Sequence, residues 1–245
     1  MNKTVIIIPS RLNALRLPNK PLELINKKEM ILHVYEAAKK TKMGDIYVAT
    51  PDQKIVDVIA NNGGKAILTS LEHQTGTDRV YEVFKNELKK EPSIIVNLQG
   101  DMPNIDPKAI TDLVLYMKKG MCDIGTLASQ FNSKKELADE NNVKVAIQEK
   151  LKSDNFGKAT DFFRTSSNKH ENIYHHVGIY AFTNKALVRY VSLERSKLEL
   201  ERKLEQLRAL ENDMSIHVGY INSSPLSVDT TNDLIEVKKV MEKNE

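Results

Sequence analysis

Short, mainly apolar runs alternate with amphipathic stretches through the first half of the chain, and this rhythm constrains the fold most strongly. The runs, each interpreted as a strand buried on both faces, are Val5–Ile8, Ile46–Ala49, Ala66–Leu68 and Ile94–Asn97. The stretches between and after them, predicted to be helices, are Met30–Lys40, Gln53–Ala60, Asp78–Leu88 and Pro107–Met117. The alternation predicts an α/β fold with a parallel sheet covered by helices. Its ligand crevice should lie at the carboxyl ends of the strands.

The rhythm changes after residue 120. Val143–Ile147 and Ile173–Phe182 are predicted to be longer strands with no helix between them. They indicate an antiparallel excursion in a mixed, mostly parallel sheet. No repeat, low-complexity tract or linker divides the chain. We therefore expect a single domain over residues 1–245, with an inserted or extended lobe at roughly 120–215.

The last part of the chain predicts two helices and a strand. Ser196–Glu211 is charged, with leucines near one stripe, and is expected to form one helix. Ile216–Tyr220 is expected to be a strand, followed by a final helix whose N-cap is Thr230 or Thr231.

Charge and cysteine content exclude several classes of protein. The formal net charge is +3 and charges of both signs are interspersed, so nothing demands a nucleic-acid partner. The single cysteine, Cys122, rules out an intrachain disulfide, does not fit a zinc site and is expected to be inert packing. No apolar run is long enough for membrane insertion, and the N-terminal MNKTVIIIPSR is expected to be a strand rather than a signal peptide. The expected location is the reducing cytoplasm.

A basic loop follows the first expected strand, where nucleotide phosphates bind in α/β sheets. Between Pro9 and Leu22 it holds three cations, Arg11, Arg16 and Lys20. Arginine can bind phosphate oxygens in pairs, lysine acts as a point charge, and the prolines of the loop lower the entropy lost on binding. The loop contains no glycine and matches neither a P-loop nor a dinucleotide-binding fingerprint, so a solvated basic loop is the alternative.

Two aspartates are candidate metal ligands. Asp101 comes directly after a buried strand and beside Gly100, where hard oxygen ligands suit Mg²⁺; a turn residue bonded to backbone N–H groups is the alternative. Asp229 precedes the final helix, and on its own a helix cap is the favoured interpretation. It gains meaning as a ligand only if it converges with Asp101.

A fourth segment, His73–Arg79, places Thr75 and Gly76 just before an expected helix. Free N–H groups at a helix N-terminus can bind a polar ligand. A simple capped helix start is the alternative interpretation.

Taken together and in this order, several segments resemble the family of 3-deoxy-manno-octulosonate cytidylyltransferases, or CMP-Kdo synthetases. The segments are IIIPSRLNALRLPNKPL, HQTGTDR, VNLQGDMP, NNVKVA, HHVGIYAF, LEQLRALE and VDTTNDL. The resemblance runs from about residue 4 to about residue 240. The ordered set is specific, because most sugar nucleotidyltransferases share only the pattern of the first loop. It implies a Rossmann-like nucleotide-diphospho-sugar transferase fold, a homodimer, and a lobe at 120–215 that serves sugar binding and dimerisation.

The resemblance also implies roles for individual residues. The CTP phosphates would be held by Arg11, Arg16 and Lys20, and the cytosine and ribose read by Gln99, Thr75 and Gly76. Mg²⁺ would be held by Asp101 and Asp229, which with Arg11 and Lys20 form the catalytic set. The Kdo pocket would be lined by His176, Tyr180, Glu205 and Gln206, with Arg164 near the sugar acid. Neighbours on a strand point to opposite faces, so His175 should face away from the pocket.

The implied reaction joins CTP and Kdo to give CMP-Kdo and pyrophosphate, which activates Kdo for lipopolysaccharide assembly. A cytidylyltransferase for a sialic-type acid and a non-catalytic nucleotide-binding regulator are the alternatives, and an amino-substituted Kdo cannot be distinguished from Kdo. The chain departs from the usual family pattern at three places. Met102 stands where the family usually has Glu, and Ala14 stands where it usually has a hydroxyl residue; the usual isoleucine-proline-tryptophan segment after Arg164 is replaced by residues 165–168. These departures put the surroundings of the metal and of Arg164 in question.

Overall fold

The computed structural model describes residues 3–13, 16–152, 155–165 and 170–243. The chain divides into two compact units. The first unit comprises residues 1–112 and 225–245, and the second comprises residues 113–224. The lobe expected at 120–215 lies entirely in the second unit, and its description as part of a single domain stays a prediction.

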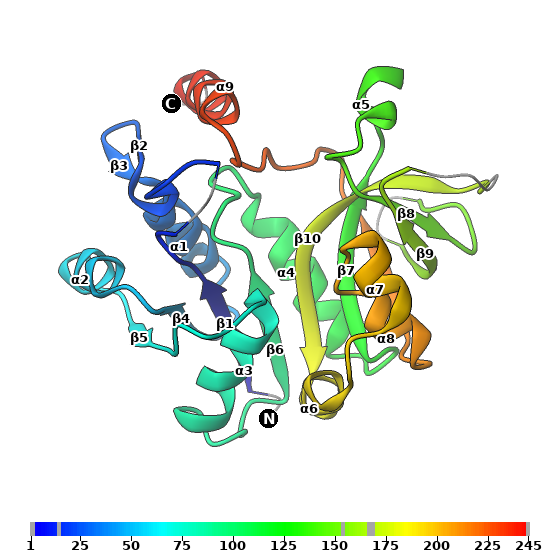
Figure 1. The fold of residues 1–245 in the computed structure, drawn as a ribbon, viewed down its shortest axis with the longest axis horizontal. Coiled ribbons are helices and arrows are strands. Elements are labelled where there is room, and N and C mark those ends of the chain that lie inside the picture. Colours follow the sequence, from blue (N-terminus) through cyan, green and yellow to red (C-terminus); the bar gives the residue numbers. More distant parts are fainter. Residues whose placement is uncertain (1–2, 14–15, 153–154, 166–169, 244–245) are drawn as a thin grey trace. The chain divides into compact units, whose positions relative to one another are not determined.

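Parallel strands form the sheet of the first unit (Figure 1). In spatial order they are β5 (Ala66–Leu68), β4 (Asp45–Thr50), β1 (Thr4–Pro9) and β6 (Ile94–Leu98). All residues of β1 and β6 are buried, as expected for strands covered on both faces. Ile6 is opposite Ile46 on one side and Val96 on the other. The predicted parallel sheet is therefore confirmed.

The helices of the first unit follow the predicted pattern closely. They are α1 (Met30–Lys40), α2 (Gln53–Asn61), α3 (Gly76–Asn86) and α9 (Thr231–Glu242), while α4 (Pro107–Met117) begins in this unit and ends in the second. Short elements after the first loop are η1 (Lys20–Leu22), β2 (Leu24–Ile25) and β3 (Lys28–Glu29). Only α3 starts noticeably early, because the Thr75 hydroxyl caps it by accepting a hydrogen bond from the Asp78 N–H.

A small apolar cluster holds the end of the chain in the first unit. Val228, Leu234 and Val237 pack with Ile25 and Met30, and all of them are buried. Burial of these side chains stabilises the docking of α9 beside the first loop. This packing places the segment before α9, which contains Asp229, in the same unit as the N-terminal part of the chain.

The second unit contains the antiparallel excursion. Its strands are β7 (Ile124–Ser129), β8 (Lys144–Ile147), β9 (Phe156–Phe163), β10 (Ile173–Thr183) and β11 (Ile216–Tyr220). β10 is antiparallel to β7 and β8, and β9 is antiparallel to β8 and β11, whereas β11 runs parallel to β7. The mixed sheet is confirmed, although β7 and β9 were not among the predicted strands.

The expected helix at Ser196–Glu211 is wrong, because the structure has two short helices there. They are α7 (Lys197–Arg202) and α8 (Leu207–Glu211), and the break begins at Lys203, whose φ is 55°. The buried Glu199 carboxylate accepts hydrogen bonds from Arg208 at 2.8 and 2.7 Å. In one continuous helix these residues would lie on nearly opposite faces, so the chain must fold back to pair them. The remaining helices of this unit are α5 (Lys134–Ala138) and α6 (Asn184–Ser192).

Two of the exclusions made from the sequence can be compared with the structure. No helix in the described parts of the chain is both long and apolar enough to cross a bilayer. Cys122 is buried, and this burial raises the pKa of its thiol to about 12. A thiol with so high a pKa is almost never a thiolate at neutral pH, which confirms the prediction of inert packing.

Candidate active site

A cleft of about 540 Å³ in the first unit gathers every residue predicted to bind nucleotide or metal. We call it the basic cleft. It lies where the chain leaves β1 and β6, at the N-terminus of α3 and beside the segment before α9. It is lined by Pro9, Ser10, Arg11, Asn13, Arg16, Lys20, Pro21, His73, Gln74, Thr75, Gly76, Arg79, Gln99, Gly100, Asp101 and Asp229.

Backbone hydrogen bonds hold both ends of the first loop. The Ser10 N–H donates to the Ala49 carbonyl at 2.9 Å, and the Leu12 N–H donates to the Asp52 carboxylate at 2.8 Å. At the far end, the Asn19 N–H donates to the Leu12 carbonyl at 3.0 Å. The loop thus closes on itself, which brings Lys20 back toward the strand ends while Arg11 and Arg16 stay exposed. Ala14, one of the departures from the family pattern, lies outside the described residues.

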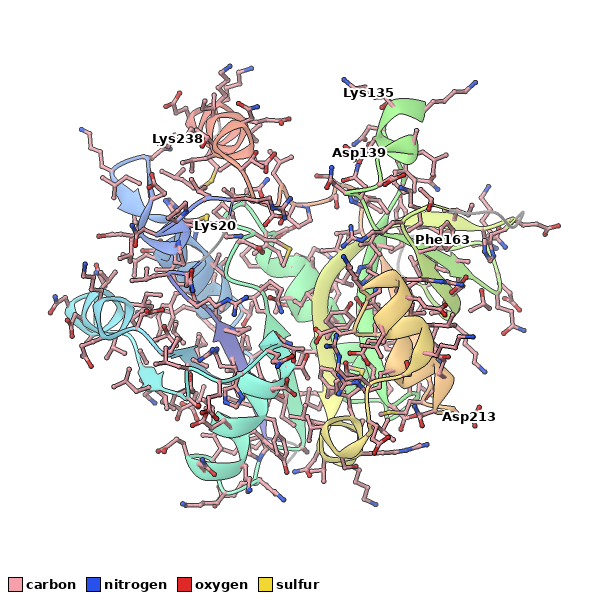
Figure 2. The ribbon with its side chains drawn as sticks, viewed as in Figure 1. Lys20, Lys135, Asp139, Phe163, Asp213 and Lys238 are labelled. Atoms are coloured by element: carbon pink, nitrogen blue, oxygen red, sulfur yellow. The ribbon has the colours of Figure 1, made fainter. Side chains whose placement is uncertain are left out.

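Lys20 joins the two candidate metal ligands. Its Nζ atom lies 3.1 Å from Asp101 Oδ2 and 3.1 Å from Asp229 Oδ1, and its side chain is only 13% exposed. Figure 2 labels the Lys20 side chain. Burial by itself lowers the pKa of Lys20, but the two carboxylates outweigh this and hold the pKa above its ordinary value. The ammonium therefore remains charged and neutralises much of the repulsion between the aspartates.

Asp229 reaches this position because its segment is tied to the end of β6. The Val228 N–H donates to the Asp101 carbonyl at 2.9 Å. The N-cap of α9 is Thr230, which exchanges hydrogen bonds with Asp233 in a capping box. The prediction of Thr230 as a cap is confirmed, and the alternative that Asp229 is the cap is wrong. The Asp229 carboxylate instead binds Lys20 and, at 3.0 Å, the Arg16 guanidinium.

Gln99 lies in a chain of polar side chains beside the start of α3. Its amide Nε2 donates to Asn97 Oδ1 at 2.8 Å, and the fully buried Asn97 donates to Thr77 Oγ1 at 3.2 Å. At Gly76, a Cβ atom would lie 3.3 Å from Gln99 Nε2, so glycine leaves this amide in place. Gln99 is consequently a positioned hydrogen-bonding group in the cleft wall.

The alternative interpretation of the segment before α3 is confirmed for one side chain. The Thr75 hydroxyl caps the helix and also donates to the Asp78 carboxylate at 2.8 Å. The residue still lines the basic cleft, together with Gly76.

Sequence reasoning missed a buried cation in the cleft wall. Arg79 is 3% exposed and donates to the Thr69 hydroxyl and, at 3.0 Å, to the Ser70 carbonyl. Burial lowers the pKa of Arg79, and the nearby charge of Arg11 lowers it further. The HQTGTDR segment contained this residue, but its inward direction depends on how α3 packs. The other polar side chains of the lining that were not predicted belong to the first loop and to the segment before α3; they are Ser10, Asn13, His73 and Gln74.

Hard oxygen ligands are available at one point of the cleft. Among the described residues, no group of three or more His, Cys, Asp and Glu side chains gathers in metal-binding geometry. Asp101 and Asp229 nevertheless share one cationic atom, the Lys20 Nζ. A divalent cation bound by this pair would need further oxygens from a ligand or from water.

The residues predicted to line a sugar pocket all lie in the second unit. His176 and Tyr180 are buried on β10, with ring centroids 5.5 Å apart, and the charge of Glu205 acts on Tyr180. We call His176, Tyr180 and Glu205 the His176 cluster. Burial lowers the pKa of His176 to about 3, and burial raises the pKa of Tyr180 well above its ordinary value. Gln206 adjoins Glu205 in the chain and is also buried.

His175 and Arg164 have other partners. His175 Nδ1 lies 3.0 Å from Glu136 Oε1, and its ring stacks on Phe131. The prediction that His175 packs apart from the pocket residue is confirmed. The Arg164 guanidinium donates to the carbonyls of Glu140 and Asn141, at 3.0 and 3.2 Å. Of the unusual segment after it, only residue 165 is within the described parts of the chain.

Met102 stands where the resemblance leads one to expect a glutamate. Its side chain is 4% exposed and belongs to the buried core. The position next to Asp101 therefore contributes packing rather than a further carboxylate.

Comparisons with known proteins identify the family of this chain. Residues 5–216 match the cytidylyltransferase family. The 3-deoxy-manno-octulosonate cytidylyltransferase of Bartonella tribocorum is 41% identical over 97% of this chain and 98% of its own. The enzyme of the same name from Brucella ovis is 42% identical over 95% of this chain and 93% of its own.

A solved structure gives the same result. CMP:2-keto-3-deoxy-manno-octonic acid synthetase, solved in complex with CTP, is 35% identical and superposes with a TM-score of 0.89. The match covers 99% of this chain and 100% of that one. The fold expected from the resemblance is thereby confirmed, and this chain belongs to the cytidylyltransferase family, among the 3-deoxy-manno-octulosonate cytidylyltransferases.

Proposed function

We propose that this protein transfers the cytidylyl group of CTP to Kdo, giving CMP-Kdo and pyrophosphate and so activating Kdo for lipopolysaccharide assembly. The observation that carries the proposal is the basic cleft, where Lys20 holds Asp101 and Asp229 beside the arginines of the first loop. This set of charges suits a triphosphate, and the relatives named for this reaction match nearly the whole chain.

Nucleotide selection is assigned to the wall of the cleft. The Gln99 amide is held by Asn97 and can form hydrogen bonds with the edge of a pyrimidine base. Glycine at position 76 leaves room for this amide, because a Cβ atom there would lie 3.3 Å from its nitrogen. A site with positioned polar groups rejects a base that leaves those groups unpaired. CTP should therefore be used in strong preference to GTP and ATP.

The transfer step needs no protein nucleophile. The anomeric 2-hydroxyl of Kdo gives its proton to a water molecule and attacks the α-phosphorus, and the bond from the α-phosphorus to the oxygen of the β-phosphate breaks to release pyrophosphate. Arg11, Arg16 and Lys20 neutralise the charge of the triphosphate and of the departing pyrophosphate. Holding both substrates in line makes the largest entropic contribution.

The residues of the cleft fit the Mg²⁺ ion that the family implies. Two carboxylates from distant segments already surround one cationic atom, and oxygen is the ligand that Mg²⁺ prefers. Asp101 and Asp229 would hold the ion, in competition with Lys20. A triphosphate attracts Lys20 and so favours this exchange. When bound, Mg²⁺ would neutralise phosphate charge and lower the pKa of the attacking hydroxyl.

The Kdo site is assigned to the second unit. His176, Tyr180, Glu205 and Gln206 offer polar atoms set among buried surroundings, which suits the hydroxyls of a sugar. Arg164 is proposed to lie near the sugar acid, and it would have to exchange its present bonds to loop carbonyls for a carboxylate. We further propose a cytoplasmic homodimer, for which light scattering on purified protein is the direct test.

Pyrophosphate release tests the proposed function. With CTP, Kdo and Mg²⁺ we expect steady release, and little with GTP or ATP at the same concentration. Chelation by EDTA should stop the reaction, and added Mg²⁺ should restore it. Comparable rates with GTP would contradict the proposed selection of the cytosine base. Turnover with a sialic acid but not with Kdo would show that the protein is a cytidylyltransferase for a sialic-type acid. Absence of any release would contradict the enzymatic function.

A further inference from the structure

Thr126 is a buried threonine whose hydroxyl meets three groups of β10. It lies on β7 and is 0% exposed. Its Oγ1 atom is 2.7 Å from the Ile179 carbonyl oxygen, 3.2 Å from the Val177 carbonyl oxygen and 3.0 Å from His176 Nε2. All four residues belong to the second unit.

Proton counting fixes the direction of these bonds. A threonine hydroxyl has one proton to donate, and a carbonyl oxygen can only accept. If the hydroxyl donated to His176, its oxygen would face two carbonyl oxygens with no proton between them. The proton therefore goes to a carbonyl, the nearer being that of Ile179, and His176 Nε2 must donate to the hydroxyl oxygen. His176 is then protonated at Nε2, and its other ring nitrogen, Nδ1, carries a lone pair.

An irregularity in the sheet explains why the carbonyls need this hydroxyl. The pairing of β10 with β7 shifts register between Val177 and Tyr180. A bulge disrupts the ladder locally and changes the direction of nearby side chains. Thr126 supplies a donor at the bulge while it orients the imidazole, so one side chain links the backbone irregularity to the ring.

The surroundings keep the imidazole neutral. Burial and, to a smaller extent, the charge of the adjacent His175 together lower the pKa of His176 to about 3. Burial, followed by the charge of Glu205, raises the pKa of Tyr180, so the phenol keeps its proton. The cluster offers a lone pair, a hydroxyl and a carboxylate. These groups suit sugar hydroxyls, and they are a poor receptor for the carboxylate of an acidic sugar.

We propose that Thr126 is a positioning residue of the sugar site, whose hydroxyl holds His176 as the Nε2-protonated tautomer so that Nδ1 accepts a hydrogen bond from a sugar hydroxyl. His176 is not completely sealed from solvent, since 8% of the residue's surface remains exposed. The part of this inference that concerns the sugar rests on the proposed function. The tautomer does not, because it follows from the contacts of Thr126 and from the burial that keeps the ring neutral.

Nuclear magnetic resonance of protein with ¹⁵N-labelled histidine tests the tautomer without any substrate. Two-bond ¹H–¹⁵N correlations distinguish a protonated from an unprotonated ring nitrogen, and the His176→Gln spectrum assigns the signal. We expect protonated Nε2 and unprotonated Nδ1 in the unmodified chain and in Thr126→Ser. Thr126→Val should lose this pattern. A ring protonated at Nδ1 in the unmodified chain would overturn the proposal, whatever the variants do.

Steady-state kinetics test the consequence for the sugar. Thr126→Val should raise the KM for Kdo about tenfold while leaving the KM for CTP unchanged, since one hydrogen bond to the substrate is misdirected. Thr126→Ser, which keeps the hydroxyl, should restore the KM. Thr160→Val is the control, because the exposed Thr160 also donates through Oγ1 to a strand carbonyl of the same unit, that of Ala146. It should leave both KM values unchanged.

The outcomes separate this proposal from a purely structural role and from the proposed function. Equal damage to both KM values in Thr126→Val, or damage in Thr126→Ser equal to that in Thr126→Val, would overturn the positioning role. Lack of pyrophosphate release by the unmodified chain would instead contradict the proposed function. The magnetic resonance measurement would still decide whether the predicted tautomer of His176 is correct.

Discussion

The basic cleft and the His176 cluster hold their polar groups in opposite ways. In the cleft, charged side chains pair with one another. Lys20 bridges two aspartates, and Arg16, whose side chain is 58% exposed, forms a further ion pair with Asp229. In the cluster, the ring of His176 is buried, neutral and held by the hydroxyl of Thr126. One site is built from exchangeable ions and the other from directed hydrogen bonds.

The difference teaches how each site can respond to its ligand. Ion pairs that are partly exposed cost little to separate, so a triphosphate and a cation can replace the internal partners of the cleft. A buried hydrogen bond is costly to leave unmade, so the cluster must be set before the sugar arrives. Substitutions that remove charge in the cleft should therefore damage turnover, whereas substitutions around the cluster should damage Kdo binding or stability.

The largest effect is expected at the aspartates of the cleft. Asp101→Asn should lower turnover about a thousandfold, because stabilisation of charge in the transition state is lost. Asp229→Asn should behave alike, and the double variant should be little worse than either, since both act on one ion. Kinetics across a Mg²⁺ titration measure this, with circular dichroism to verify folding. Normal turnover of Asp229→Asn at low Mg²⁺ would show that the cleft does not use the pair.

A large loss of stability is expected from the ion pair that supports α7 and α8. Glu199 is 0% exposed and binds Arg208, so Glu199→Gln should cost about 3 kcal/mol of unfolding free energy because the buried Arg208 loses this ion pair. Urea titration measures this loss. An unchanged urea midpoint would show that the ion pair between Glu199 and Arg208 does not stabilise the region that carries Glu205 and Gln206.

The same residue predicts a pH dependence. Burial alone would raise the pKa of Glu199, but hydrogen bonds from Arg208 and Arg195 outweigh it and hold the pKa below its ordinary value. A depressed pKa stabilises the fold above the pKa of the unfolded chain and ceases to do so as the pH falls through the folded value. The difference in stability between the unmodified chain and Glu199→Gln should be full at neutral pH and shrink in acid. A constant difference would contradict this ion pair.

Lys20→Ala should have a smaller but clear effect on nucleotide use. We expect kcat/KM for CTP to fall about a hundredfold, because the triphosphate loses a charge-assisted contact. Lys20→Arg should not restore it, since the guanidinium fork cannot take the place of a compact ammonium between two carboxylates. Lys28→Ala is the matched control, because Lys28 binds Glu36 outside the lining of the cleft. If both alanine variants lowered kcat/KM equally, the loss would result from the change in net charge and not from a contact of Lys20 with the triphosphate.

The smallest effect is expected at Gln206. Gln206→Ala should raise the KM for Kdo about tenfold through the loss of one hydrogen bond, and should leave CTP binding measured by calorimetry unchanged. Gln53→Ala, at an exposed glutamine bonded to Asp57, should change neither quantity. If Gln206→Ala weakened both ligands equally, the separation of the two sites would not hold.

The sequence by itself determined the elements whose residues follow local periodicity. Strand and helix periodicity depends only on the spacing of apolar residues that are close in the sequence. For this reason the sequence predicted the strands β1, β4, β5 and β6 and the amphipathic helices between them. The cap at Thr230 was predictable for the same reason. The identity of the site residues came from ordered motifs, and those of the nucleotide site do line one cleft.

Only the tertiary structure decided which distant groups meet. Glu199 pairs with Arg208 after a chain reversal at Lys203, Lys20 bridges Asp101 and Asp229, and Thr126 meets His176 across a bulge. None of these contacts can be read from helix or strand periodicity, because each depends on a chain reversal or on the docking of elements far apart in the chain. Their free energies arise from burial and from exclusion of water, and these exist only once the fold has formed.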